Sequence, residues 1–169
     1  LYLNAGIVNA QILRQMLQVV RYVKEIYLSL LYVNTTEILT TLSEFKIFAL
    51  VLLCSDLKYL NNETFVGLSK LKSLTVLDVN METIYDGTFR NMKSLTKLIL
   101  YYELNSANKS HLFDGLNNLQ SLTIRSRSTD LFKTNKIFNK CLEPTSFLGL
   151  YNLVELYLES NGITCISRS

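Results

Sequence analysis

The amino-acid sequence predicts an α/β fold, a solenoid in which short parallel strands form a concave sheet and helical or 3₁₀ segments form the convex side. Two recurring patterns support this prediction. A Leu-x-Leu strand motif directs both leucines to one side of a strand, because side chains alternate along the backbone. A Phe-x-x-Leu or Phe-x-x-Met tag, with the spacing of a helical turn, occurs at 65–68, 89–92, 113–116 and 147–150. Together the two patterns define a leucine-rich repeat, whose stacked coils form a horseshoe.

The strand motif recurs often enough to predict about seven repeats within residues 1–169. One coil cannot bury both of its apolar sides, whereas stacked coils share a continuous core, so we expect a single array. The inward pairs of the strands are predicted to be Leu1/Leu3, Ile26/Leu28, Leu50/Leu52, Leu77/Val79, Leu98/Leu100, Leu122/Ile124 and Leu156/Leu158.

The repeats are unevenly spaced when counted from the first apolar residue of each motif. These first residues are Ile47, Leu74, Leu95, Leu119 and Leu153. The second interval is the shortest and the last is the longest. Repeats of this class are roughly two dozen residues long, so the last interval contains an insertion, which we place at about 129–144. Such insertions become loops on one face and often bind ligands. A neutral surface loop is the alternative, because added loop length costs little closure entropy.

The first 46 residues fit the repeat less well and are expected to include helices on the convex side. Segments 9–20 and 36–45 each carry an apolar stripe with the spacing of one helical face. The apolar runs at 27–33 and 47–54 are too short to span a bilayer, which takes about 20 residues, and we expect buried strands there. The predicted buried stripes are Ile12, Met16, Val19 and Val20 in the first helix, and Ile38, Leu39, Leu42 and Phe45 in the second.

Both ends of the sequence lack the polar or cysteine-rich cap that covers the end of a solenoid core. The first residues belong to a strand motif, and the last ones stop part-way through a repeat. We therefore expect an uncapped fragment of a longer ectodomain. The composition suits this reading, because 49% of the 169 residues are apolar, and the net charge of +3 is too small to indicate nucleic acid by itself.

Three glycosylation sequons agree with passage through the secretory pathway, where the asparagine of Asn-x-Ser/Thr accepts a glycan. They are centred on Asn34, Asn62 and Asn108, and all three follow predicted strands rather than interrupting leucine positions.

The three cysteines differ in their expected roles. Cys141 and Cys165 are separated by the length of about one repeat, so adjacent coils can bring them within disulfide range. A free thiol, or a partner elsewhere in a longer chain, is the alternative that an odd cysteine count leaves open. Cys54 ends a predicted strand and is expected to be a small buried hydrophobic residue.

The motifs of the main enzyme classes are missing from the sequence. His111 is the only histidine, and the sequence has no phosphate-cradling glycine loop, no paired-cysteine zinc spacing and no Gly-x-Ser-x-Gly turn. We therefore predict a binding protein, not an enzyme, with no cofactor and no metal site.

Two groups of residues are candidates for ligand binding. The aromatic, weakly charged strip expected on the concave face suits protein or lipid partners better than phosphate. A basic cluster in and just before the insertion is the only local charge excess, and nucleic acid as its ligand is possible but not favoured, because acidic residues lie nearby and a single histidine is a poor acid sensor. The concave candidates are Tyr27, Asp78, Asn80, Ile99, Tyr101, Tyr102, Arg125, Tyr157 and Glu159, and the basic loop candidates are Arg127, Lys133, Lys136 and Lys140.

Several phrases of the sequence resemble the ectodomains of Toll-like receptors. They are Leu-Thr-Val-Leu-Asp-Val at 74–79, Gly-Thr-Phe-Arg-Asn-Met-Lys-Ser-Leu at 87–95, Phe-Asp-Gly-Leu-Asn-Asn-Leu at 113–119 and Leu-Val-Glu-Leu-Tyr-Leu-Glu-Ser-Asn at 153–161. The resemblance is good over 47–166 and weak before it, and both caps of the family are missing.

The resemblance implies the ligand-recognition part of an innate immune pattern-recognition receptor. Such a receptor binds a microbial or protein ligand or a co-receptor, forms a homodimer or heterodimer, and signals through a cytoplasmic domain. It would be a single-pass membrane protein at the cell surface or in endosomes, attached through segments outside this sequence. The alternative is a secreted or membrane-tethered adhesion or matrix leucine-rich repeat protein without signalling activity.

Overall fold

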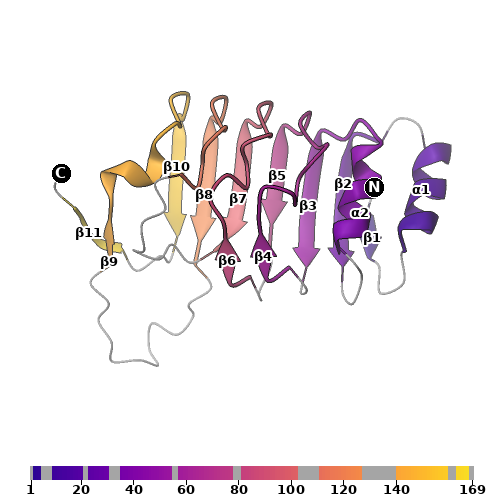
Figure 1. Ribbon diagram of the computed structural model, residues 1–169, viewed down its shortest axis with the longest axis horizontal. Coiled ribbons are helices and arrows are strands. Elements are labelled where there is room, and N and C mark those ends of the chain that lie inside the picture. Colours follow the sequence, from indigo (N-terminus) through magenta and orange to yellow (C-terminus); the bar gives the residue numbers. More distant parts are fainter. Residues whose placement is uncertain are drawn as a thin grey trace.

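The molecule is a solenoid whose main sheet contains seven parallel strands in the order β1-β2-β3-β5-β7-β8-β10 (Figure 1). Each strand pairs with the strand of the next repeat, which confirms the predicted leucine-rich repeat fold. The strands are β1 (Tyr2–Asn4), β2 (Glu25–Leu30), β3 (Ala49–Cys54), β5 (Ser73–Val76), β7 (Lys97–Tyr101), β8 (Ser121–Arg125) and β10 (Glu155–Glu159). The computed structural model describes residues 2–4, 9–20, 23–30, 35–54, 57–77, 81–102, 111–126, 140–159 and 163–167.

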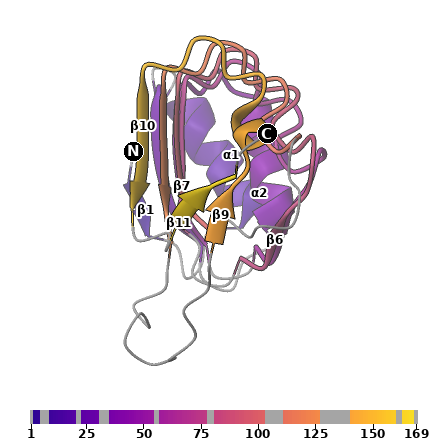
Figure 2. The ribbon, with the colours of Figure 1, turned by 90° about the vertical axis from the view of Figure 1, so that its left-hand side faces the viewer.

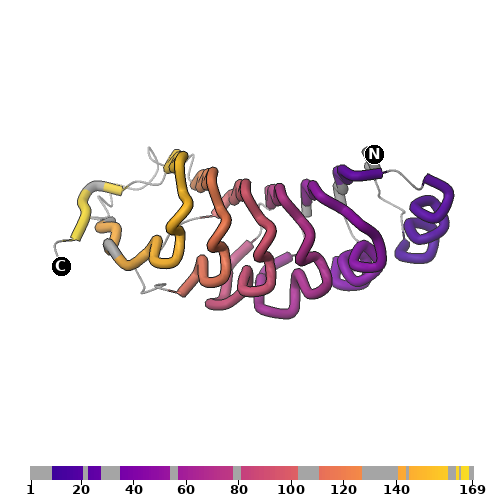
Figure 3. The backbone as a smooth tube through the Cα atoms, turned by 90° about the horizontal axis from the view of Figure 1, so that it is seen from above, coloured from indigo at the N-terminus to yellow at the C-terminus, as the bar shows by residue number. Residues whose placement is uncertain are grey.

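The side of the array opposite the main sheet holds the two α-helices and a small parallel sheet (Figure 2). Seen from above, the strands follow a shallow arc whose hollow side faces away from the helices (Figure 3). The main sheet is therefore the concave face. The convex elements are α1 (Ala10–Val19), α2 (Thr35–Ser43) and β4 (Tyr59–Leu60), which pairs with β6 (Thr83–Ile84). A second small parallel sheet, β9 (Lys140–Leu142) paired with β11 (Ile163–Ile166), lies at the C-terminal end of the array beyond β10 (Figure 1), and the 3₁₀ helix η2 (Pro144–Phe147) follows β9 in the chain.

The repeat that contains β5 has a different phase from the predicted one. β5 places Leu74 and Val76 in the core, whereas Leu77 is partly exposed and Val79 lies outside the described residues. Leu74 aligns with Leu50 on one side and with Leu98 on the other. Two overlapping apolar pairs exist in this segment, and pairing with both neighbouring strands selects the first.

The uneven spacing predicted around Leu74 is therefore wrong. One constant interval separates the aligned core positions Ile26, Leu50, Leu74, Leu98 and Leu122. The interval from Leu122 to Leu156 is longer, and it spans the predicted insertion. The repeats are evenly spaced before the insertion, and only the last strand of the main sheet follows its predecessor at a longer interval in the sequence.

The core repeats from coil to coil. In β7, Leu98 and Leu100 are buried and Ile99 is partly exposed, as the alternation along a strand predicts. The aromatic tags also pack on one another: the rings of Phe65 and Phe89 are nearly parallel, and their centroids are 6.0 Å apart. Each coil thus buries its leucines and its phenylalanine against the next coil, which is why the array is held by contacts between neighbours.

The first helix buries a different face from the predicted one. Leu13 and Leu17 are in the core of the array, whereas Ile12, Val19 and Val20 are exposed. Two apolar stripes run along this helix, and only the one with Leu13 faces the second helix and the sheet. The prediction for the second helix is confirmed at its three buried positions, and its fourth predicted residue is partly buried just beyond the helix. Those residues are Ile38, Leu39, Leu42 and Phe45.

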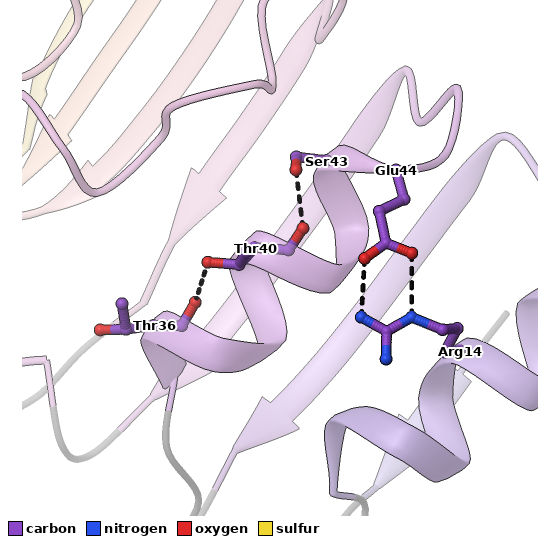
Figure 4. Close-up of polar contacts among 5 residues, drawn as sticks. All are labelled: Arg14, Thr36, Thr40, Ser43 and Glu44. Atoms are coloured by element: carbon purple, nitrogen blue, oxygen red, sulfur yellow. Dashed lines mark hydrogen bonds and ion pairs between the residues drawn. The ribbon is translucent and has the colours of Figure 1, made fainter.

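Polar contacts fix the two helices relative to each other (Figure 4). The guanidinium of Arg14 donates hydrogen bonds of 2.9 and 2.6 Å to the carboxylate of Glu44, which follows α2. Within α2, the hydroxyl of Thr40 donates to the carbonyl of Thr36 at 2.9 Å, so this exposed threonine is satisfied inside its own helix.

Part of the predicted insertion is structured. Residues 140–144 form β9 and begin η2, whereas 129–139 lie outside the described residues. Neither helix in the described part of the chain has the length and apolar content needed to cross a bilayer.

Candidate functional site

The concave face presents its solvent-facing side chains in three rows, because the strands align residue by residue. The first row is Glu25, Ala49, Ser73, Lys97, Ser121 and Glu155. The middle row is Tyr27, Val51, Thr75, Ile99, Thr123 and Tyr157. The third row includes Leu53, Tyr101, Arg125 and Glu159, with Leu77 at the same place one residue after β5.

The centre of this face is apolar. Val51, Leu77 and Ile99 are each partly exposed, and Leu53 is 40% exposed at the end of β3. We call Val51, Leu53, Leu77, Ile99 and Tyr101 the apolar patch. Because these side chains project from paired strands, they keep their positions without a partner, which lowers the entropy cost of binding.

A charged cluster lies beside the apolar patch, across β7, β8 and β10. Arg125 forms a hydrogen-bonded ion pair with Glu159 and donates a 2.6 Å hydrogen bond from Nη1 to the hydroxyl of Tyr101. The guanidinium carbon also lies 5.3 Å from the centroid of the Tyr101 ring, within the range of a cation–π contact. The hydrogen bond to Glu159, followed by the one to Tyr101, raises the pKa of Arg125. Arg125 is thus charged, but a carboxylate compensates its charge.

Six of the predicted concave residues lie in the rows described above: Tyr27, Ile99, Tyr101, Arg125, Tyr157 and Glu159. Tyr102 does not, and that prediction is wrong. Its side chain is only 3% exposed, because it follows the outward-facing Tyr101 and therefore points to the other side of the sheet. Its backbone N–H donates to the carbonyl of Arg125 at 3.0 Å.

Asp78 and Asn80 lie outside the described residues, after the end of β5. The concave position they were expected to hold in β5 is taken by Thr75, which is absent from the predicted set, as are Leu53 and Leu77. Val51, Thr75 and Ile99 follow one another at equal intervals of one repeat, and this regularity is the signal that identifies Thr75.

The basic loop cannot be placed as a cluster. Arg127, Lys133 and Lys136 lie outside the described residues, and for Lys140 the backbone alone is described, in β9. Nearby, Arg125 lies on the concave face and is paired with Glu159.

A disulfide joins Cys141 in β9 to Cys165 in β11, with Cα atoms 4.5 Å apart. Just beyond the ends of these two strands, the hydroxyl of Ser167 donates to the carboxylate of Glu143 at 2.8 Å. The covalent link and this hydrogen bond hold two adjacent coils together at the C-terminal end of the array. Cys54 ends β3, and its side chain is outside the described part of the structure.

Of the remaining candidates, Asn62 and His111 belong to described turns outside the main sheet. Asn62 is exposed in the turn that follows β4, while Asn34 and Asn108 lie outside the described residues. His111 is exposed, with Nδ1 3.3 Å from a carboxylate oxygen of Asp114. Within the described residues no group of acidic, histidine and cysteine side chains has the arrangement of a metal site.

The fold and the open concave sheet define a leucine-rich repeat solenoid protein, a class whose members typically serve as non-enzymatic scaffolds for protein interaction. The chain belongs to the BspA type leucine rich repeat region family, which matches residues 40–145 in six copies.

The fold is also similar to a solved structure described as the "Toll - Spatzle complex, a molecular hub in Drosophila development and innate immunity". The TM-score is 0.60 at 17% sequence identity, and the likeness covers 98% of this chain but 25% of the solved chain. At this identity the likeness concerns the fold. A comparison with curated protein sequences finds no match.

Proposed function

We propose that this chain is the ligand-recognition part of a Toll-like innate immune receptor, located outside the cell or in an endosome, and that its concave face binds a protein ligand. The apolar patch is the observation that carries the proposal. Its five aliphatic or aromatic side chains each have part of their surface in solvent, and a protein partner buries side chains of this kind at the centre of an interface. They are Val51 and Leu53 from β3, Ile99 and Tyr101 from β7, and Leu77 just after β5, the strand between these two.

The neighbouring charged cluster supports a protein ligand over a nucleic acid. Binding to phosphates requires cations that can release counterions, whereas Glu159 already compensates the charge of Arg125. The cluster still offers oriented polar groups at the rim of the apolar patch. Rims of this kind give specificity more than affinity.

The fold likeness to Toll in complex with Spatzle supports a receptor role, because Toll there is bound to another protein. The experiment addresses the binding face directly. A photo-crosslinking amino acid is introduced at Thr75 or Ile99 on the concave face, and at Tyr85 on the convex side as the matched control. The crosslinking chains are incubated with extracellular fluid of the source organism.

The proposal expects one discrete crosslinked protein from Thr75 and Ile99 and none from Tyr85. The substitution Ser121→Asn converts Ser-Leu-Thr on β8 into a sequon, and a glycan there should abolish the crosslink. Crosslinks of equal yield from both faces, or crosslinks that survive this glycan, would show that the concave face is not the binding site.

The signalling role is tested separately from binding. A Toll-like receptor requires a transmembrane helix and a Toll/interleukin-1 receptor domain in the same gene, whereas an adhesion or matrix protein lacks that signalling domain. A chimaera of this chain with such a cytoplasmic domain should activate a reporter only in the presence of the crosslinked ligand. Ligand binding without any activation would favour the adhesion or matrix role.

A further inference from the structure

We infer that Asn62 carries an N-linked glycan, and that this glycan shields the convex side of the array so that protein partners approach through the concave face. The inference rests on the proposed function in one respect, because glycosylation requires entry into the secretory pathway. Three observations support it: the hydrogen bonding of the turn around Asn62, the place of this turn in the fold, and the surface beside it.

The turn around Asn62 leaves this side chain without a structural task. Asn61 stabilises the turn: its Oδ1 accepts from the backbone N–H of Glu63 at 2.9 Å and from the hydroxyl of Thr64 at 3.2 Å. The backbone N–H of Asn61 in turn donates to the hydroxyl oxygen of Thr64 at 2.9 Å. Among the described residues the exposed amide of Asn62 makes no hydrogen bond, so a glycan can replace one of its hydrogens without breaking the turn.

The turn lies far from the concave sheet in the architecture. It follows β4, which pairs with β6 in a sheet separate from the main one. Figures 1 and 2 place this small sheet on the side of the array away from the main strands. A glycan at Asn62 therefore leaves the apolar patch open.

The surface beside this turn is one that a protein could otherwise bind. Tyr59 and Tyr85 are about half exposed, and their ring centroids are 6.3 Å apart. The hydroxyl of Tyr59 donates to Glu82 at 3.1 Å, which fixes its ring on the surface. Exposed tyrosine pairs are common in interfaces. A bulky, hydrophilic glycan two residues after β4 covers this pair and keeps proteins away from it.

Glycan occupancy is the first test. The chain is secreted from insect or mammalian cells behind a heterologous leader, so that occupancy does not depend on its natural location. Peptide mapping before and after peptide N-glycosidase should find a glycan at Asn62. Asn62→Gln should remove it, whereas Asn61→Gln, which alters the turn but not the sequon, should retain it. A secreted chain with unmodified Asn62 would overturn the inference.

Shielding is the second test. Lactoperoxidase, a protein-sized iodinating enzyme, is applied to the glycosylated chain and to Asn62→Gln. Tyr59 and Tyr85 should be iodinated severalfold faster in the variant, while the concave Tyr157 reacts equally in both. Equal iodination rates at Tyr59 in the glycosylated chain and in the variant would overturn the shielding, although the glycan at Asn62 would still stand. Neither outcome depends on the ligand, so failure of the crosslinking experiment and failure of this inference are separable.

Discussion

The middle repeats and the two ends of this array are stabilised by different means. Leu122 in β8 is fully buried between neighbours on both sides, whereas Leu156, at the same position in β10, is 42% exposed. β8 lies between two strands, and β10 has one neighbour in the sheet. A leucine at a repeat position is therefore buried only to the extent that both flanking coils are present, which is the nearest-neighbour behaviour expected of a solenoid.

Both ends also carry local links, and at the C-terminal end these accompany weaker burial. The last two coils are joined by the disulfide between Cys141 and Cys165, and the first helix is tied to the second by the ion pair of Arg14 and Glu44. In the middle, stacked phenylalanines and buried leucines serve instead.

The first prediction compares the two equivalent leucines. Leu122→Ala should lower the free energy of unfolding by about 2 to 5 kcal/mol, because it empties a site shared by neighbouring coils. Leu156→Ala should cost about 1 kcal/mol or less, because its side chain is already partly in water. Urea unfolding at one pH and temperature measures both, with Thr123→Ala as a surface control. Equal losses at Leu122 and Leu156 would refute the nearest-neighbour account.

The second prediction concerns the covalent link at the C-terminal end. Replacing both Cys141 and Cys165 by Ser should destabilise this region by about 3 to 4 kcal/mol, since the disulfide links positions with a sequence separation of 24. Hydrogen exchange should accelerate in β9, β10 and β11, while β3, β5 and β7 keep their protection, because solenoid contacts are local. Reduction of the unaltered chain should reproduce the pattern. Uniform acceleration along the array would contradict it.

The third prediction uses two glycines in equivalent convex turns. Gly115 and Gly149 both have positive φ, of +91° and +89°, so alanine at either site should cost about 1 to 2 kcal/mol of backbone strain. A Cβ on Gly115 would also lie 2.5 Å from the carbonyl oxygen of Arg90 in the preceding coil, whereas at Gly149 no atom lies within 4 Å.

Gly115→Ala should therefore destabilise the chain more than Gly149→Ala does, by about 1 to 3 kcal/mol, the usual cost of overpacking. Thermal unfolding of the two variants beside the unaltered chain measures this difference. If the two midpoints fall by the same amount, the close approach between the middle coils contributes nothing.

The class of fold was predictable because one motif is repeated along the chain, so an error in the phase of one repeat does not change the fold that the other repeats indicate. The phase of β5 was not, since Leu74/Val76 and Leu77/Val79 satisfy the same local pattern. Only the pairing of Leu74 with Leu50 and Leu98 separates them. Tyr102 was misplaced for a similar reason, because it lies one residue beyond the end of β7 and the alternation turns its side chain to the buried side of the sheet.

The candidate site was predictable where strand phase was known and not elsewhere. Ile99, Tyr101 and Arg125 follow directly from the alternation in β7 and β8. The apolar patch also includes Leu77, which the predicted inward pair Leu77/Val79 placed in the core, and Leu53, which is absent from the predicted concave set although the alternation from Leu50 and Leu52 turns it outward. The face of α1 was mistaken for a related reason, because two apolar stripes compete and the neighbours of the helix choose between them.

The smallest effect is expected at the N-terminal end, from the ion pair of Arg14 and Glu44. The hydrogen bond from Arg14 lowers the pKa of Glu44 below its ordinary value of 4.5, with further lowering by the charge of Arg14 and an opposing effect of desolvation. A carboxyl whose pKa is depressed by folding stabilises the folded state above its unfolded pKa, and that contribution is lost as the pH falls through the folded pKa. The pair is exposed and screened by salt, so its contribution is small.

A double-mutant cycle of Arg14→Gln and Glu44→Gln isolates this contribution from the rest of the acid response. The coupling between the two substitutions should be present at neutral pH in low salt, and it should vanish in acid below the ordinary carboxyl range, where Glu44 is protonated. Added salt at neutral pH should weaken it. The disulfide at the other end should show no such dependence over the same range, because it does not titrate. A coupling that persists in acid would mean that packing between α1 and α2, rather than charge, joins the first helix to the array.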